Sequence, residues 1–107
     1  MWTTPYNFRA DRNEIRRIAR ILGKHVQDDW MRVNWPVPRP FSGELLLKKV
    51  AGRDEERPAY LLSLHRDSDG KCDFSSLDLY DLANDIAEYA NADVKVDGSC
   101  FGSLLQK

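Results

Sequence analysis

The sequence predicts an α+β fold in which two helices pack on one face of a small, mostly antiparallel sheet. Three observations favour this class: two segments with apolar residues every three or four positions, two short leucine-rich segments between them, and an Asp-Gly turn near the C-terminus. The expected order is α-β-β-α-β-β, a two-layer sandwich. The chain has 107 residues, of which 42% are hydrophobic and 31% charged, as in a folded domain. We therefore expect residues 1–107 to form one domain, with residues 1–10 as an N-terminal arm.

The first helix is expected to begin at Asp11, which with Glu14 can satisfy free backbone N–H groups at the helix start. Apolar residues at helical spacing predict that the helix continues to Val33. Gly23 interrupts it at a cost of about 1 kcal/mol relative to alanine, which indicates a bend or a close contact with another backbone. The expected buried stripe consists of Ile15, Ile18, Ala19, Leu22, Val26, Trp30 and Val33.

The middle of the chain predicts a stiff connector followed by a β-hairpin. Prolines alternate with other residues in 34–42, which favours an extended connector. Short leucine-rich segments at 44–50 and 59–65 predict two paired strands, and the charged residues 51–58 between them predict an exposed loop. The side of the second strand expected to face the helices carries Tyr60, Leu62 and Leu64.

The second helix is expected from Ser75, with Asp78 three residues later, to about Asn91. The turn at Asp97-Gly98 then predicts a closing hairpin, because this dipeptide suits a tight two-residue turn between strands. The expected buried stripe of the helix consists of Leu79, Leu82, Ala83, Ile86 and Ala90.

The two halves of the chain carry opposite charge. Residues 1–53 hold eleven Lys and Arg against five Asp and Glu, whereas residues 54–107 hold five against twelve. The formal net charge of −1 conceals this difference. The basic face of the first helix carries Arg12, Arg16, Arg17, Arg20 and Lys24, and the acidic face of the second carries Asp78, Asp81, Asp85 and Glu88.

The acidic face has two interpretations that the sequence leaves open. Like charges at these spacings repel by a few tenths of a kcal/mol per pair, and no Lys or Arg within the second helix relieves the repulsion. A binding surface would explain why such a pattern is present. A solvated face that keeps the protein soluble would explain it as well.

The charge pattern favours a small, non-catalytic protein-binding module that uses its acidic face against a basic site on another protein. Trp2, Tyr80 and Tyr89 are candidate apolar anchors. Size and charge suit an inhibitor or an antitoxin-like protein, including one used in phage–host conflict. The two complementary faces also allow a homodimer.

Nucleic-acid binding through the basic face of the first helix is the alternative. Arginine and lysine side chains there could neutralise phosphates and so give a salt-dependent affinity. A sequence pI near 6.1 argues against it, since nucleic-acid-binding domains are usually basic.

No motif for catalysis, a metal or a cofactor is present. Asp67, Asp69 and Gly70 fit part of a calcium loop, but His65 and Ser76 stand where that loop needs carboxylates. The soft ligands Cys72, Cys100, His25 and His65 lack zinc-site spacing. A Cys72–His65 catalytic pair would lie among aspartates that disfavour the thiolate. We therefore expect no enzyme activity and no cofactor.

The sequence also predicts a cytoplasmic protein without a membrane partner. No apolar segment approaches the roughly 20 residues of a membrane-spanning helix, and the N-terminus lacks the features of a signal peptide. Its two cysteines are then expected to be reduced.

Overall fold

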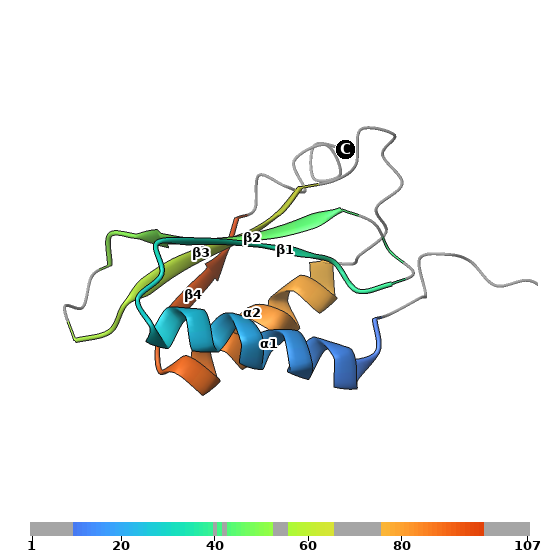
Figure 1. Cartoon of the computed structure of the whole chain (residues 1–107), viewed down its shortest axis with the longest axis horizontal. Coiled ribbons are helices and arrows are strands. Elements are labelled where there is room, and N and C mark those ends of the chain that lie inside the picture. The colour runs from blue at the N-terminus through green and yellow to red at the C-terminus, as the bar shows by residue number, and fades with distance from the viewer. Residues whose placement is uncertain (1–9, 40, 42, 53–55, 66–75, 98–107) are drawn as a thin grey trace, which may run out of the picture.

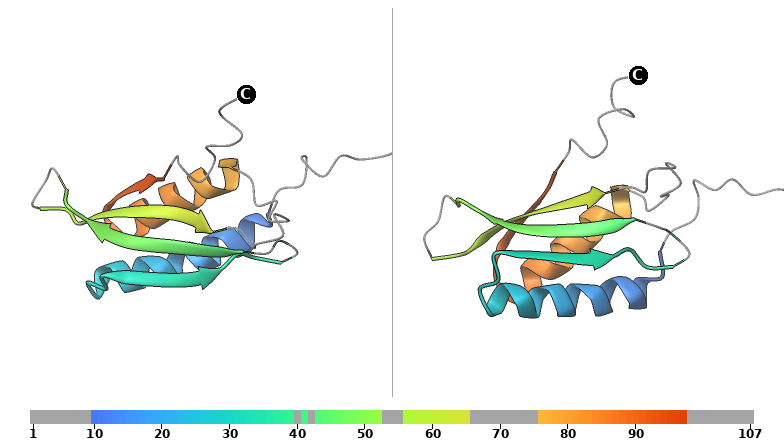
Figure 2. Two further views of the ribbon diagram at one scale, coloured as in Figure 1. Left: turned by 90° about the horizontal axis from the view of Figure 1, so that it is seen from above. Right: turned by 45° about the horizontal axis from the view of Figure 1, so that its top comes forward.

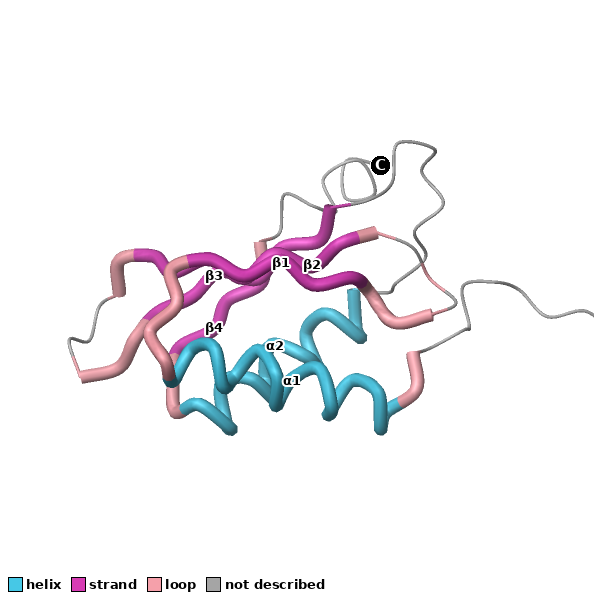
Figure 3. Tube along the Cα trace, viewed as in Figure 1, coloured by secondary structure: helices cyan, strands magenta, loops and turns pink. Residues whose placement is uncertain are grey.

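The computed structural model describes residues 10–39, 41, 43–52, 56–65 and 76–97 (Figure 1). In order along the chain, the elements are α1 (Arg12–Gln27), β1 (Arg32–Pro36), β2 (Glu44–Val50), β3 (Ala59–His65), α2 (Ser76–Ala90) and β4 (Asp93–Val96). The fold is α+β, as expected. The expected order α-β-β-α-β-β is wrong, because three strands precede the second helix and the order is α-β-β-β-α-β (Figure 3).

The four strands form one mixed sheet in the order β1-β2-β3-β4. Strands β1 and β2 are antiparallel, as are β2 and β3, whereas β4 runs parallel to β3. The expectation of a mostly antiparallel sheet missed this last pair. The chain passes through α2 between β3 and β4. This helical crossover carries the chain back to the end of the sheet at which β3 begins, so β4 runs in the same direction as β3. Figures 1 and 2 show both helices on the same side of the sheet.

The hydrophobic core lies between the helices and the sheet. The two leucine-rich strands have the bounds expected from the sequence, and Tyr60, Leu62 and Leu64 are buried as predicted. From the helices the core receives Ile15, Ile18, Leu22, Val26, Leu79, Leu82 and Ile86. Alternation along β2 adds Leu45 and Leu47.

Helix α1 begins as predicted but ends six residues early. The side chain of Asp11 caps the start by accepting a hydrogen bond from the N–H of Asn13 at 2.9 Å. The helix ends at Gln27 because Asp29 adopts a left-handed conformation, with φ of 62°. Trp30 is therefore exposed rather than part of the buried stripe, and Val33 is buried on β1. Their spacing after Val26 continued the helical period only by coincidence.

Strand β1 occupies part of the segment expected to be a proline-rich connector. Residues 34–36 belong to this strand, so the connector does not begin at residue 34. The strand lies at the edge of the sheet, and Pro36 is its last residue. An edge strand tolerates proline because one row of its backbone groups has no partner strand. Beyond it, the N–H of Val37 donates to the carbonyl of Gly43 at 3.2 Å.

Helix α2 leads directly into β4. Asn91 has a φ of 53° and follows the last helical residue, the position at which helices often end in a left-handed residue. Strand β4 is then fixed beside β3, where the N–H of Asp93 donates to Pro58 and that of Asp97 to Leu62, both at 2.8 Å. The expected Asp97-Gly98 turn and the strand after it involve residues 98–107, outside the described residues. In the described part of the chain, no helix is long and apolar enough to cross a membrane.

Candidate functional site

The four acidic residues expected on one exposed face of α2 lie in different environments. Asp78 is fully buried, and its Oδ2 accepts a hydrogen bond from the N–H of Ala10 at 3.0 Å. The expectation that Asp78 is exposed is therefore wrong: this carboxylate fastens the chain just before α1 to the first turn of α2. A buried carboxylate is tolerated where hydrogen bonds compensate for lost water. Glu88, at the other end of the row, is exposed.

Arg12 of α1 contacts the middle of the acidic row on α2. Its guanidinium donates to Oδ2 of Asp81 at 3.0 Å and lies 4.0 Å from Oδ2 of Asp85. Both carboxylates remain partly exposed, with 38% and 31% of their side-chain surface accessible. Asp81 and Asp85 are thus partly neutralised by a cation of the same chain, and the acidic surface is weaker than the sequence indicated.

The basic residues of α1 also differ in their environments: some form ion pairs within the chain and others do not. Arg17 forms a 2.5 Å ion pair with Glu14, one turn earlier on the helix. The hydrogen bond from Arg17 lowers the pKa of Glu14, and the pKa of Arg17 is raised in return. Among the basic residues of this face of α1, Arg16, Arg20 and Lys24 are exposed and form no ion pair with any described residue.

The predicted acidic and basic faces meet along one line between α1 and α2, which we call the helix seam. The two helices run side by side in the same direction (Figure 1), with the Ala10–Asp78 contact at their N-terminal ends. A groove of about 310 Å³ follows the seam. It is lined by Arg16, Ala19, Arg20, Asp85, Glu88 and Tyr89.

Tyr89 lies against the one glycine of α1. A Cβ atom at Gly23 would come within 2.6 Å of Cδ1 of Tyr89, so only glycine leaves room for the ring in this position. The sequence predicted a bend or a close contact with another backbone at Gly23, whereas the contact that the structure shows is with the Tyr89 side chain. Tyr89 keeps 46% of its surface exposed.

Two large apolar residues are exposed at the turn from α1 to β1, residues 28–31, which we call the α1–β1 corner. Trp30 is 51% exposed and Met31 is 66% exposed. The indole ring of Trp30 meets the imidazole of His25 edge-on, with ring centroids 4.8 Å apart. Both side chains therefore face solvent at the end of the molecule where α1 finishes.

The backbone of the corner is held by neighbouring elements. The hydroxyl of Tyr60 donates to the carbonyl of Trp30 at 2.7 Å, and the N–H of Lys49 donates to the carbonyl of Met31 at 2.9 Å. The ammonium of Lys49 also forms an ion pair with Asp29, which raises the pKa of Lys49. Burial raises the pKa of the Tyr60 hydroxyl, which favours its neutral, donating form.

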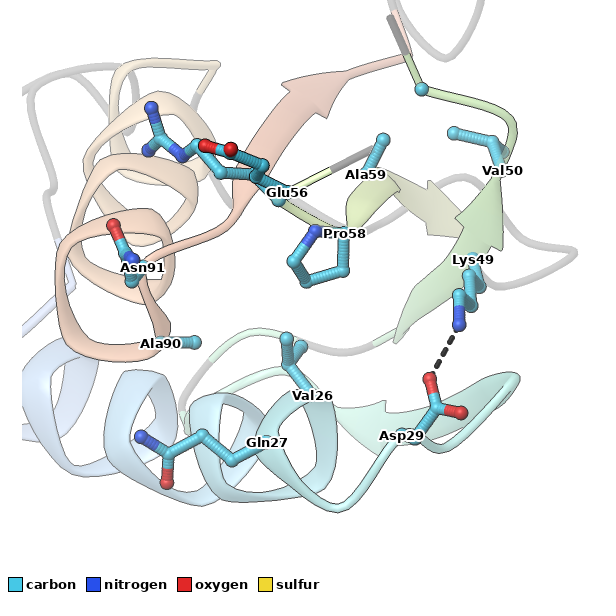
Figure 4. A pocket seen from close by; sticks show the side chains of 12 residues that line it. Val26, Gln27, Asp29, Lys49, Val50, Glu56, Pro58, Ala59, Ala90 and Asn91 are labelled. Atoms are coloured by element: carbon cyan, nitrogen blue, oxygen red, sulfur yellow. Dashed lines mark hydrogen bonds and ion pairs between the residues drawn. The ribbon is translucent and has the colours of Figure 1, made fainter. Parts of the chain in front are cut away.

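A cavity of about 620 Å³ opens beside the corner (Figure 4). The Lys49–Asp29 ion pair forms one side, and the apolar side chains of Val26, Pro58 and Ala59 lie around the centre. The remaining lining residues are Gln27, Val50, Gly52, Glu56, Arg57, Ala90 and Asn91. This mixture of apolar and charged groups suits the binding of a side chain or a short peptide segment.

Of the four soft metal ligands, His25 and His65 lie in the part of the chain that the structure describes. His25 packs on Trp30, whereas His65 is exposed at the end of β3. Among the described residues, no group of three or more His, Cys, Asp or Glu could hold a metal ion. The candidates Asp67, Asp69, Gly70, Cys72 and Cys100 lie outside the described residues, as does the proposed anchor Trp2.

The α1–β1 corner was not predicted from the sequence, because the helical spacing of Trp30 indicates a place in the core. Two signals could have revealed it. The pair Asp28-Asp29 favours a helix end, since aspartate tolerates the left-handed conformation better than most residues. Polar and apolar residues then alternate from Arg32 to Trp35, which is the period of a strand.

Comparison with known proteins adds no assignment. No protein-family model, no curated protein and no solved structure matches this chain. The function must therefore be argued from the chain's own surfaces.

Proposed function

We propose that this protein is a non-catalytic protein-binding module whose apolar anchor is the α1–β1 corner. The observation that carries the proposal is the exposure of Trp30 and Met31 on a hydrogen-bonded backbone. Tryptophan is enriched among the residues that dominate binding energy at protein interfaces, and methionine adapts to irregular partner surfaces. Covering such side chains with a partner removes apolar surface from water, which stabilises a complex by about 25 cal/mol per Å² before the costs of association.

The rigidity of the corner supports a binding role. Asp29 is a non-glycine residue at positive φ, a conformation that costs of order 1 kcal/mol or more and recurs at ligand-binding sites. Contacts from Lys49, Tyr60 and His25 hold the segment in place. An anchor that is already ordered loses less conformational entropy on binding.

Charged surfaces beside the anchor would select the partner. The Lys49–Asp29 ion pair borders the cavity beside the corner, and Glu56 and Arg57 also line this cavity. Charge complementarity of this kind chiefly steers encounter and excludes wrong partners. The acidic face of α2 has a smaller part here than the sequence indicated, since Asp78 is buried and Arg12 contacts Asp81 and Asp85. Covering a partner's site in this way is all that an inhibitor or antitoxin-like protein needs to do.

The proposal is tested by capturing partners from the source cell on immobilised protein. We expect wild type to retain a partner that Trp30→Ala loses at least tenfold, with unchanged circular dichroism and melting. Leu77→Ala is the matched control, because Leu77 is also apolar and 59% exposed but lies at the start of α2. Equal retention by wild type and Trp30→Ala, or retention of nothing by wild type, would reject the corner as an anchor.

Nucleic-acid binding is a second candidate, supported by the three exposed α1 cations that form no ion pair with a described residue. Arg16, Arg20 and Lys24 follow one another at intervals of one helical turn. Phosphates would neutralise such a row, and binding would weaken steeply as salt is added. A filter-binding titration should then show affinity at low salt that Arg16→Glu/Arg20→Glu removes. No binding by wild type at low salt excludes this function.

A further inference from the structure

We propose that the outer surface of α1 and α2 binds a second copy of this chain, related to the first by a two-fold axis parallel to the helix seam. This surface is distinct from the α1–β1 corner, so the inference does not depend on the proposed function. Cations line one side of the seam and carboxylates line the other. A two-fold rotation about an axis along the seam brings the cations of one copy opposite the carboxylates of the other, so the surface is complementary to itself.

The direction of the two helices determines which two-fold arrangement matches the charges. Helices α1 and α2 run the same way, and Arg16, Arg20, Asp85 and Glu88 line the same stretch of groove. Rotation about an axis along the seam places α1 of one copy over α2 of the other while preserving the position along the seam. Arg16 and Arg20 then face Asp85 and Glu88 of the second copy, and the reciprocal pairs form at the same time.

Other face-to-face arrangements are disfavoured by charge. A two-fold axis perpendicular to the seam would place α1 over α1 and α2 over α2. The unpaired cations of the two α1 helices would then oppose one another, which costs free energy in both copies. Only the axis along the seam brings every like-charged row opposite its complement.

The exposed residues of the surface agree with an interface of modest strength. Tyr80 and Tyr89 on α2 are each about half exposed, at 50% and 46%, and can stack with arginine guanidinium groups of the second copy. Two helices about 23 Å long and together about 20 Å wide give a footprint of roughly 450 Å² per copy. The total of roughly 900 Å² is at the low end for specific interfaces, so we expect a weak, reversible dimer.

The experiment measures self-association by analytical ultracentrifugation over a range of protein concentrations, at about 20 mM and at about 500 mM NaCl. Wild type should dimerise at low salt and dissociate at least tenfold more readily at high salt. Arg20→Glu and Glu88→Lys should each weaken dimerisation at least tenfold, because each reversal places like charges opposite one another twice in the dimer. Neither side chain forms an ion pair with a described residue, so the fold should persist.

Mixing the two variants provides the decisive measurement. In a dimer of one Arg20→Glu chain with one Glu88→Lys chain, both contacts pair opposite charges, so an equimolar mixture should recover the wild-type affinity. Lys48→Glu is the control for Arg20→Glu, since it makes the same change in net charge on an exposed strand residue, remote from the helix seam. A monomer at all concentrations in low salt, or a mixture that stays monomeric, would overturn the proposal. Neither result would affect the capture test with Trp30→Ala.

Discussion

At the scale of single residues, Gly23 and Tyr89 show how an absent side chain sets the contact between two helices. Glycine in a helix costs about 1 kcal/mol relative to alanine, so its presence in α1 calls for a compensating contact. The Tyr89 ring occupies the space where a Cβ atom of residue 23 would lie. Glycine at position 23 therefore lowers the helix propensity of α1 but allows the Tyr89 ring of α2 to pack against α1.

The effect of Gly23→Ala should consequently depend on Tyr89. In wild type the added methyl group forces the ring to move, and overpacking of this kind costs about 1–3 kcal/mol, which offsets or exceeds the gain of about 1 kcal/mol in helix propensity. In a Tyr89→Ala background, the same substitution should stabilise the protein by up to about 1 kcal/mol. Urea unfolding of the four variants in a double-mutant cycle measures the coupling. Additive effects would show that the ring does not restrict residue 23.

Asp78 was predicted to be part of an exposed binding face, but the structure shows it buried and hydrogen-bonded to the backbone of Ala10. Its replacement by alanine leaves the buried N–H of Ala10 without this acceptor, which should lower the free energy of unfolding by about 1–3 kcal/mol. Asp78→Asn keeps an oxygen acceptor and should cost less. Asp81→Asn, at a partly exposed site, should change stability by no more than about 1 kcal/mol. Chemical denaturation compares the three, and equal effects for Asp78→Ala and Asp81→Asn would contradict a structural role for Asp78.

At the scale of elements, α1 is stabilised near its start by the Glu14–Arg17 ion pair, whose pH dependence can be measured. The pKa of Glu14 is lowered from its ordinary value of 4.5, first by the hydrogen bond from Arg17. A lowered pKa in the folded state stabilises the fold at pH values above 4.5, and this contribution is lost as the pH falls through the folded-state pKa. NMR titration of the Glu14 carboxyl should therefore give a midpoint below 4.5.

Arg17→Gln should move the Glu14 midpoint upward towards its ordinary value. Arg16→Gln is the matched control, because Arg16 is a neighbouring arginine of α1 that forms no ion pair with a described residue. It should leave the midpoint nearly unchanged. Equal shifts in the two variants would mean that the general positive charge of α1, and not the specific pair, lowers the Glu14 pKa.

The elements also show which parts of the fold a sequence of this kind can predict. Strands β2 and β3 were predicted with their correct bounds, because both are short, leucine-rich and flanked by turn residues. Strand β1 was missed, since Trp30 and Val33 extend the helical period of α1 by chance and Pro36 argues against a strand unless it lies at an edge. Edge position and the parallel placement of β4 depend on long-range pairing, which local patterns do not contain. The α1–β1 corner was not predicted for a related reason. Trp30 is exposed because α1 ends at Gln27, and the residues around Trp30 do not by themselves indicate that exposure.

At the scale of the whole molecule, the opposite charges of the two halves meet because the fold places α1 beside α2. Arg12 spans the seam to Asp81 and Asp85 at 3.0 and 4.0 Å. Like charges within each helix are separated by a full turn, with Cβ atoms about 5–6 Å apart and longer distances between the charged ends. Attraction across the seam should therefore outweigh repulsion along each helix. Because the formal net charge is only −1, overall self-repulsion does not obscure this balance.

Salt should consequently destabilise the monomer. Raising NaCl from about 10 to about 300 mM shortens the Debye length from about 30 Å to about 6 Å, and should lower the free energy of unfolding by a few tenths to about 1 kcal/mol. Urea unfolding at a concentration too low for self-association measures the change. Arg12→Gln should remove most of the salt dependence, whereas Lys48→Gln, on an exposed strand position, should preserve it. An increase in stability with salt would mean that repulsion within α1 and within α2 exceeds the attraction between them, and the charge polarity would then have to be explained by ligands outside the chain.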